Sequence, residues 1–193
     1  MNTDELLTKY HNGEREFIAT DLADACLTER CLAAIDLSQS QLTNANLSGS
    51  DLQCANLSAT VLTRANLWRS NLTSASLVSA NLNQASLIRA TLIGVDGEGA
   101  CLRNTDLRLA NLQGANLSHA NLMGADLRYA DLTGVNLAGA NLSRANLTGA
   151  NLSQAELRGV TLKKAIFDNA YISEVCLLDV DLSQVDLRYA LLK

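Results

Sequence analysis

The residues of this chain that could carry out chemistry are few and lie far apart. Its two histidines are His11 and His119, and neither has a second metal ligand or a catalytic partner nearby in the sequence. The glycine-rich stretch 93–100 lacks the Lys-Ser/Thr pair and the helical pattern of a phosphate-binding loop. The sequence therefore predicts no catalytic, cofactor-binding or metal-binding residues, and a protein that is not an enzyme.

The cysteines number five, an odd count without the short paired spacings of a zinc site or a disulfide framework. Such usage suits a reducing cytoplasm, and we expect a cytoplasmic protein with structural cysteines. Redox pairing or metal capture by Cys26 and Cys31 stays open as an alternative. The others are Cys54, Cys101 and Cys176.

Composition narrows the class of protein. A chain of 193 residues that is 48% apolar is long and hydrophobic enough to bury a core, but 4% aromatic residues is low for an ordinary enzyme. No apolar run is long enough for a membrane-spanning helix, and residues 1–5 lack the basic flank of a secretory signal. We expect no association with membranes.

A period of five residues dominates the chain. From Phe17 to Leu192, 35 of 36 positions at this spacing are Leu, Phe or Ile, and the exception is Gly97. The position two residues earlier is Ala in 21 of 35 cases, and the position one residue earlier is Asp or Asn in 21 of 35. The repeating unit is Ala-Asn/Asp-Leu-x-x, and unbroken repeats of this kind indicate a solenoid.

This period fits neither a helix nor a continuous strand. Five residues rotate a helix by about 500°, and an odd period on a strand sends successive leucines to opposite faces. All the leucines can face one interior only if the chain turns once per repeat. Asn, Asp, Ser, Thr and Gly at the remaining positions are the residues that tolerate such corners.

The Ala-Asn/Asp-Leu-x-x repeats of residues 17–192 resemble those of the pentapeptide repeat proteins. The resemblance implies an all-β solenoid, a right-handed quadrilateral β-helix with four pentapeptides per coil and about nine coils in this chain. Stability should then rise with the number of coils, because each coil contacts only its neighbours.

The two ends of the predicted solenoid differ. Residues 1–16 are expected to form a helical cap and lead-in, with a helix over residues 3–12 capped by Thr3 or Asp4, and residues 17–193 the β-helix. Residues 10–17 are similar to the lead-in of some cyanobacterial family members, in which a short helix plugs the first coil. At the C-terminal end the repeats become bulkier. Either the last coil widens and closes, or it forms a homodimer contact through Tyr171, Leu178, Tyr189 and Leu191.

Gly97 breaks the leucine pattern and allows two interpretations. Neighbouring leucines could lean into the gap, because an open void of that size would cost several kcal/mol. Alternatively, the segment could bulge outward as a recognition loop formed by Asp96, Gly97, Glu98 and Gly99.

Charge position separates the known activities of the family. Its best-known activity is gyrase binding by imitation of DNA, which requires a sustained acidic face. Residues 1–36 carry eight acids and three bases, but residues 37–90 carry one acid, Asp51, against three arginines. Gyrase binding by imitation of DNA therefore stays as an alternative function, and a purely structural rod is a second alternative. Nucleic acid is disfavoured as a partner because the net charge of the chain is −5.

Stacking every twentieth residue brings the only tryptophan and four arginines into one strip about 15 Å long. Trp, Tyr and Arg are enriched where protein partners dock. We therefore expect a non-enzymatic scaffold with a regulatory role that binds an unidentified protein; pairing of the arginines with Asp106 and Asp126 is the competing interpretation. The strip consists of Trp68, Arg69, Ile88, Arg89, Arg108, Leu109, Arg128 and Tyr129.

Overall fold

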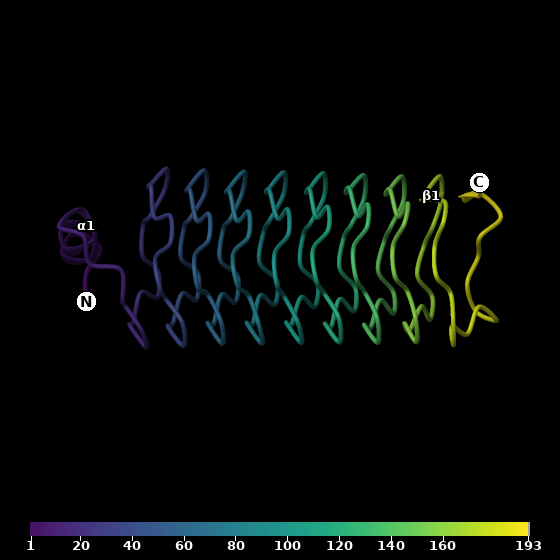
Figure 1. Ribbon diagram of the computed structural model, residues 1–193, viewed down its shortest axis with the longest axis horizontal. Helices are drawn as coiled ribbons and strands as arrows, with labels where there is room; N and C mark the ends of the chain where they lie inside the picture. Colours follow the sequence, from purple (N-terminus) through teal and green to yellow (C-terminus); the bar gives the residue numbers. More distant parts are fainter. Residues whose placement is uncertain (193) are drawn as a thin grey trace.

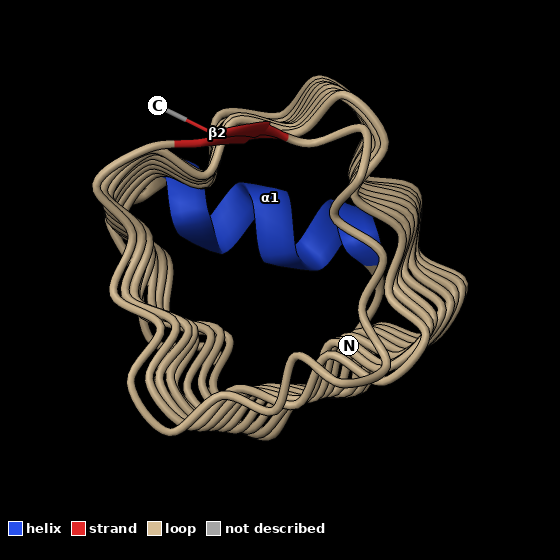
Figure 2. Ribbon diagram, turned by 90° about the vertical axis from the view of Figure 1, so that its right-hand side faces the viewer, coloured by secondary structure: helices blue, strands red, loops and turns tan. Residues whose placement is uncertain are grey.

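The computed structural model describes residues 1–192 and contains few regular elements. They are helix α1 (Thr3–His11) and the two-residue strands β1 (Tyr171–Ile172) and β2 (Leu191–Leu192), which pair in parallel. The rest of the chain winds in stacked coils along one long axis, with α1 at one end and the C-terminus at the other (Figure 1). Seen along this axis, each coil has four corners (Figure 2).

Parallel bridges join residues that are twenty positions apart, from Glu16↔Asp36 to Ile166↔Asp186. Between bridges the backbone is hydrogen-bonded to the next coil: the Leu47 N–H donates to the Asn66 carbonyl at 2.7 Å, and the Asn66 N–H donates to the Ala45 carbonyl at 2.9 Å. Four pentapeptides therefore make one turn of the chain, and every twentieth residue occupies the same column.

Each corner is a tight turn made by the two residues that follow Leu. At one corner the Ala45 N–H donates to the Leu42 carbonyl at 3.0 Å, and Asn44 between them has a φ of 58°. A left-handed third residue is the requirement of a type II turn, and it explains why Gly and Asn recur at this position. Bulkier residues occupy it as well, including Arg89 and Tyr129.

Asn and Asp precede Leu because their side chains satisfy backbone and neighbouring side-chain groups. Asn46 Oδ1 accepts a hydrogen bond from the Ser48 N–H at 3.1 Å, the geometry of an Asx turn, and another from Asn66 Nδ2 at 3.2 Å. The first bond starts the corner and the second ties successive coils together.

The Leu and Ala columns form a single apolar core along the axis. Leucines such as Leu67 and Leu127 are fully buried, and the alanines two residues before them, Ala65 and Ala125, are buried in the same core. Buried polar residues at the Ala position bond backbone carbonyls: Ser50 Oγ donates to Leu47 O at 2.6 Å and Thr105 Oγ1 to Leu82 O at 2.9 Å.

Helix α1 lies across the N-terminal end of the stack (Figures 1 and 2). It buries Leu6 completely, and the Tyr10 hydroxyl donates to the Ala33 carbonyl at 2.8 Å. The N-cap is Asn2, not Thr3 or Asp4 as the sequence suggested, because Asn2 Oδ1 accepts the Glu5 N–H at 2.8 Å. The helix also ends at His11, one residue earlier than expected.

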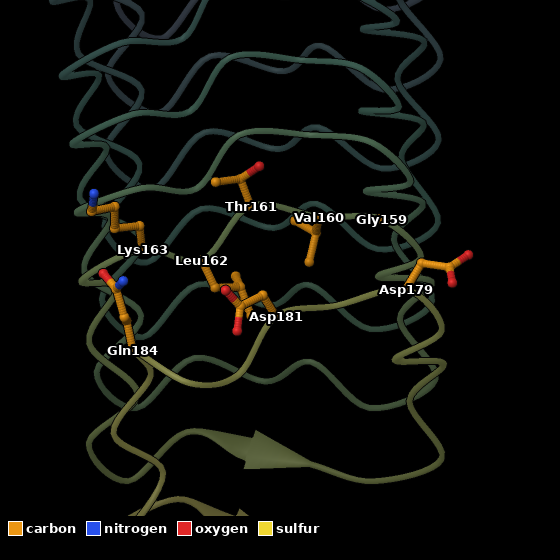
Figure 3. Close-up of a pocket in the computed structure, with 8 residues that line it drawn as sticks. All are labelled: Gly159, Val160, Thr161, Leu162, Lys163, Asp179, Asp181 and Gln184. Atoms are coloured by element: carbon orange, nitrogen blue, oxygen red, sulfur yellow. The ribbon is translucent and has the colours of Figure 1, made fainter.

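The C-terminal coil pairs less completely with the coil before it. A cavity of about 390 Å³ opens between them, with Val160 and Leu162 on one side and Asp179 and Asp181 on the other (Figure 3). The side chains of the last coil do not close this end of the solenoid. Leu177 and Leu182 are 37% and 38% exposed, although the leucines at the same positions in earlier coils are buried.

The pentapeptide around Gly97 does not protrude. Asp96 bridges Asn116, and the Gly97 N–H donates to the Asn116 carbonyl at 2.7 Å, so the backbone keeps its regular path. A Cβ on Gly97 would lie 2.8 Å from Leu117 Cδ2. Leu117 has therefore moved into the space left by the missing side chain, and Asp96, Gly97, Glu98 and Gly99 form no outward loop.

Candidate functional site: an arginine–aromatic strip

The fold brings the eight residues of the predicted strip together at and beside one corner of four successive coils. Backbone hydrogen bonds of 3.0 Å link the Arg69 N–H to Ile88 O, the Arg89 N–H to Arg108 O and the Leu109 N–H to Arg128 O. The turn places two side chains from each coil in parallel columns. We call this surface the arginine–aromatic strip; it consists of Trp68, Arg69, Ile88, Arg89, Arg108, Leu109, Arg128 and Tyr129.

Large apolar side chains of the strip are open to solvent. Trp68, Leu109 and Tyr129 are 43%, 47% and 62% exposed, whereas Ile88 is partly covered. The Arg69 guanidinium lies 5.1 Å from the Trp68 ring centroid, within cation–π range. Beside this pair is a hollow of about 320 Å³ that is lined by Glu29 and Gly49.

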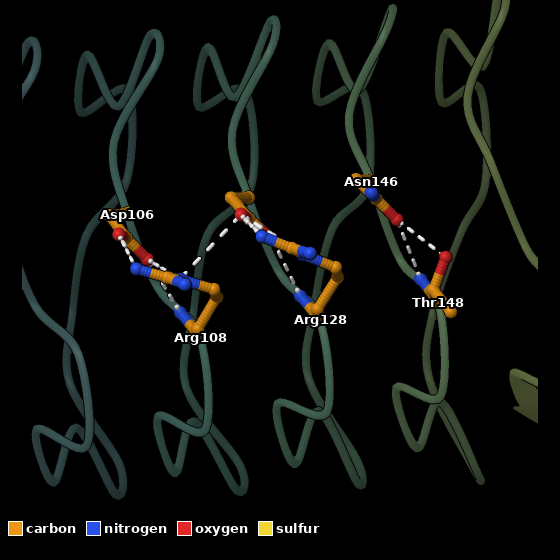
Figure 4. Close-up of polar contacts among 6 residues, drawn as sticks. Asp106, Arg108, Arg128, Asn146 and Thr148 are labelled. Atoms are coloured by element: carbon orange, nitrogen blue, oxygen red, sulfur yellow. Dashed lines mark hydrogen bonds and ion pairs between the residues drawn. The ribbon is translucent and has the colours of Figure 1, made fainter.

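Arg108 and Arg128 are held along the strip by carboxylates. Arg108 Nη2 lies 2.7 Å from Asp106 Oδ2, Arg128 Nη2 lies 2.6 Å from Asp126 Oδ2, and Arg108 Nε lies 3.7 Å from Asp126 (Figure 4). Partial burial raises the pKa of Asp126, but hydrogen bonds from Arg128 outweigh that effect and hold it below its ordinary value. In the following coil Thr148 replaces arginine and bonds Asn146 (Figure 4).

Arg69 and Arg89 differ from these two arginines. Both are exposed, and within residues 1–192 neither forms an ion pair. The pairing with Asp106 and Asp126 that competed with partner binding is therefore present, but it accounts for half of the arginines. The free cations lie beside Trp68 and Ile88.

Tyr129 is packed over the next coil. A Cβ on Gly149 would lie 2.5 Å from Tyr129 Cδ1, so glycine is what allows the ring to lie against the backbone there. A second hollow of about 360 Å³ follows, lined by Tyr129, Asn151 and Tyr171 among others. The two aromatic ends of the strip thus each border a shallow depression.

The other residues considered in the sequence lie apart from the strip and from one another. His11 lies in α1, where Nδ1 is 2.6 Å from the Leu7 carbonyl, and His119 lies at a corner over Gly139. Cys26, Cys31 and Cys54 are exposed. Within the described part of the chain, no three His, Cys, Asp or Glu residues gather in a way that could hold a metal ion.

The side chains considered for a homodimer contact lie at the C-terminal end and are exposed. The exposed fraction is 48% for Tyr171, 55% for Leu178, 64% for Tyr189 and 41% for Leu191. Arg188 lies between Asp186, at 2.5 Å, and the Tyr189 ring, at 5.9 Å. An apolar surface is therefore present there, without a partner to define its role.

A row of five cations at another corner was missed in the sequence. It could have been found by sorting every charge, not only those near tryptophan, by its place in the twenty-residue period. All five are exposed. We call this row the basic corner; it consists of Arg64, Arg103, Arg144, Lys163 and Lys164.

Comparisons with known proteins agree with the geometry. Profiles described as pentapeptide repeats and as a pentapeptide repeat region match residues 31–77, 125–163 and 65–142. The chain belongs to the pentapeptide repeat family, whose members form right-handed quadrilateral β-helices. No curated protein sequence matches it significantly.

Two solved structures illustrate the similarity. HetL, a pentapeptide repeat protein involved in heterocyst differentiation regulation in the cyanobacterium Nostoc sp. strain PCC 7120, is 29% identical, with a TM-score of 0.53 over 98% of this chain and 96% of HetL. QnrB1, a plasmid-mediated fluoroquinolone resistance protein, is 22% identical, with a TM-score of 0.65 over 92% of each chain. The likeness to QnrB1 concerns the fold alone.

Among the described residues, no helix has the length and apolar character needed to cross a membrane.

Proposed function

We propose that this protein is a non-enzymatic binding module with a regulatory role and that a protein partner docks on the arginine–aromatic strip. The observation that carries the proposal is the exposure of Trp68 beside Arg69 and Arg89, which have no carboxylate partner within residues 1–192. An exposed aromatic side chain flanked by free guanidinium groups suits a partner surface that is acidic or mixed. The similarity to HetL is consistent with a regulatory role.

Rigidity supports this function. Every strip residue is fixed to a neighbouring coil by a backbone hydrogen bond, and Arg108 and Arg128 are further oriented by Asp106 and Asp126. Little conformational entropy is then lost when a partner binds, so a modest contact area can give useful affinity.

Imitation of DNA receives less support. Asp51 is the one acidic residue of residues 37–90, and the residue bridged to it in the next coil is Asn71. No row of carboxylates therefore runs along the axis in this part of the chain. Such imitation would need a sustained acidic face. A DNA-supercoiling assay with gyrase is expected to show no inhibition, and inhibition would favour this alternative over the strip.

The same proposal includes the finer organisation of the molecule. We assign residues 1–16 to a cap and lead-in and residues 17–193, of which Lys193 lies outside the described residues, to a β-helix of about nine coils, in a cytoplasmic protein. A homodimer through the C-terminal coil is part of it, since Leu178, Tyr189 and Leu191 are exposed. Sedimentation should show a dimer for the wild type and a monomer for a Tyr189→Asp/Leu191→Asp variant; a monomeric wild type would refute the dimer.

The strip is tested by quantitative affinity capture from native extract. A Trp68→Ala/Arg89→Glu variant should lose the partners that the wild type retains. The matched control, Ile93→Ala/Arg158→Glu, changes an exposed apolar residue and an arginine outside the strip and should keep them. Equal recovery by both variants would contradict docking on the strip.

A further inference from the structure

The basic corner carries five cations without an acidic residue among them. In the six coils from residue 60 to residue 164, the pentapeptides that form this side contain Arg64, Arg103, Arg144, Lys163 and Lys164 and no Asp or Glu. All five side chains are exposed, and none is in an ion pair within residues 1–192. This concentration is not a property of the whole chain, which has a net charge of −5.

Two hollows lie between these cations. The first, about 300 Å³, is lined by Arg64 and Arg103, with Asn83 and Gln84 between them. Arg64 Nε donates to Gln84 Oε1 at 3.0 Å, which holds the guanidinium at the edge of this hollow. The second, about 370 Å³, is lined by Met123, Ser143 and three cations, namely Arg144, Lys163 and Lys164.

The basic corner ends in acidic residues on both sides. In the first coil the pentapeptide on this side contains Asp21 and Asp24, and Asn44 Nδ2 donates to Asp24 at 3.0 Å. In the last coil the pentapeptide on this side contains Asp181, which lines the cavity that Lys163 also borders (Figure 3). The cationic part spans five coil steps, or about 24 Å at a sheet-like spacing of about 4.8 Å. A long polyanion would extend onto these acids.

We propose that the basic corner is a second docking surface and that it binds an acidic α-helix of a protein partner. Arg64, Arg103 and Arg144 lie two coils apart, which is about 9.6 Å from one to the next. Residues seven apart on a helix face the same side and are about 10.5 Å apart, and 16 residues of helix cover about 24 Å. Carboxylates seven residues apart on such a helix would meet Arg64, Arg103 and Arg144 in turn. A fourth carboxylate, three residues after the third, would meet Lys164.

Other polyanions fit this corner less well. On an extended strand, side chains of the same face are about 6.6 Å apart, which does not match the step of about 9.6 Å between the cations. Duplex DNA carries one charge per about 1.7 Å, or about 14 over this length, against five cations. Single strands are bound through aromatic side chains on which the bases stack, and Met123 is the largest apolar residue lining either hollow.

The test is fluorescence anisotropy with a labelled 18-residue helical peptide that carries Glu at positions 1, 8, 15 and 18. A comparator has the same composition with its glutamates spread around the helix. The corner variant is Arg103→Gln/Arg144→Gln/Lys164→Gln, and the control Lys9→Gln/Arg158→Gln/Arg188→Gln removes the same charge elsewhere. Glutamine already occupies the left-handed corner position at Gln39 and Gln84, so the corner variant should fold.

At low salt the wild type should bind the spaced peptide at least about tenfold more tightly than the corner variant, since each exposed ion pair contributes only a few-fold. The control variant should stay within about twofold, and added salt should weaken binding. The proposal is overturned if the peptide does not bind, if the comparator binds equally, if the control loses as much, or if duplex DNA binds more tightly.

This inference does not rest on the arginine–aromatic strip. The Trp68→Ala/Arg89→Glu variant should bind the spaced peptide as the wild type does, and the corner variant should keep any partner that docks on the strip. Failure at one surface is therefore distinguishable from failure at the other.

Discussion

The two ends of the solenoid have the same repeat but different surroundings. At the N-terminal end, α1 covers the stack and Leu6 is fully buried. At the C-terminal end, Leu177 and Leu182 occupy the column positions that bury Leu157 and Leu162 one coil earlier, yet more than a third of each side chain is exposed. A leucine in this fold is buried by the coils on both sides of it, so its contribution to stability depends on where its coil lies.

The backbone shows the same contrast. The Leu142 N–H donates to the Thr161 carbonyl at 2.8 Å, whereas the cavity of about 390 Å³ separates Leu162 from Asp181 one coil later. Bonds resume where the Leu191 N–H donates to the Ala170 carbonyl at 2.8 Å. The last coil is therefore attached at some sides and open at another, and we expect it to open before the rest of the stack.

The largest effect is expected for leucines in the two settings. Leu67→Ala should lower the free energy of unfolding by about 2–5 kcal/mol, because the cavity is closed on every side. Leu182→Ala, at a position 38% exposed, should cost about 1 kcal/mol. Urea unfolding followed by circular dichroism measures both, and equal losses would show that the last coil is as well packed as the interior.

The N-terminal and C-terminal ends of the solenoid can be compared by replacing one leucine at each end with aspartate. Leu6→Asp should cost about 2–3 kcal/mol, because a carboxylate cannot stay in the buried site and α1 must detach. Leu178→Asp, at a site that is 55% exposed, should change stability by no more than about 0.5 kcal/mol in the monomer. Thermal unfolding with limited proteolysis would report both, and a tolerated Leu6→Asp would mean that α1 does not protect the core.

Backbone strain offers a smaller effect of opposite sign. Ser79 and Asp179 are non-glycine residues with φ of 57° and 59°. Ser79→Gly should stabilise the fold by about 0.5–1 kcal/mol, since the left-handed penalty exceeds the entropy cost of glycine. Asp179→Gly should leave the main unfolding transition unchanged if its coil opens first. A matching gain at Asp179 would contradict early opening.

The smallest effect concerns the carboxylates that bind arginine. Hydrogen bonds from Arg188 lower the pKa of Asp186 to about 2 from an ordinary value near 3.8. Since the folded pKa is the lower one, this pair stabilises the fold above about pH 4 and the contribution is lost as the pH falls toward 2. Arg188→Gln should return the pKa of Asp186 toward its ordinary value in an NMR titration.

The interior pair provides the comparison for this titration. Asp126 contacts two arginines, at 2.6 Å and 3.7 Å, and both lower its pKa against the rise that burial causes. The pKa of Asp126 should therefore be higher in an Arg108→Gln/Arg128→Gln variant than in Arg128→Gln. Equal pKa values in the two variants would show that Arg108 does not act across the coils.

Much of the fold follows from the sequence because one physical requirement repeats. A leucine every fifth residue, with Asn or Asp before it, leaves only a chain that turns once per repeat, and the family supplied four repeats per coil. The cap residue was missed because Asn2, Thr3 and Asp4 are all suitable, and only the bond from the Glu5 N–H distinguishes Asn2.

The arrangement of the candidate site was predicted in part, and its role stays a prediction. Spacing by twenty residues placed Trp68 and Tyr129 on one strip, but the pairing of each arginine depends on side-chain geometry, so the difference between Arg89 and Arg108 needed the structure. Gly97 shows the same limit: the missing side chain is visible in the sequence, whereas the shift of Leu117 into the gap is not. The basic corner escaped notice because its cations are spread over a hundred residues.

The twenty-residue coil also restricts how such a chain can change in length. Gain or loss of a whole coil would lengthen or shorten the tower and leave every surface row aligned. Gain or loss of one pentapeptide would keep the leucines inside but rotate all later residues by a quarter turn, so Arg144 and Lys164 would leave the side that carries Arg64. Length variants of this protein that keep both docking surfaces should therefore differ from it by multiples of twenty residues.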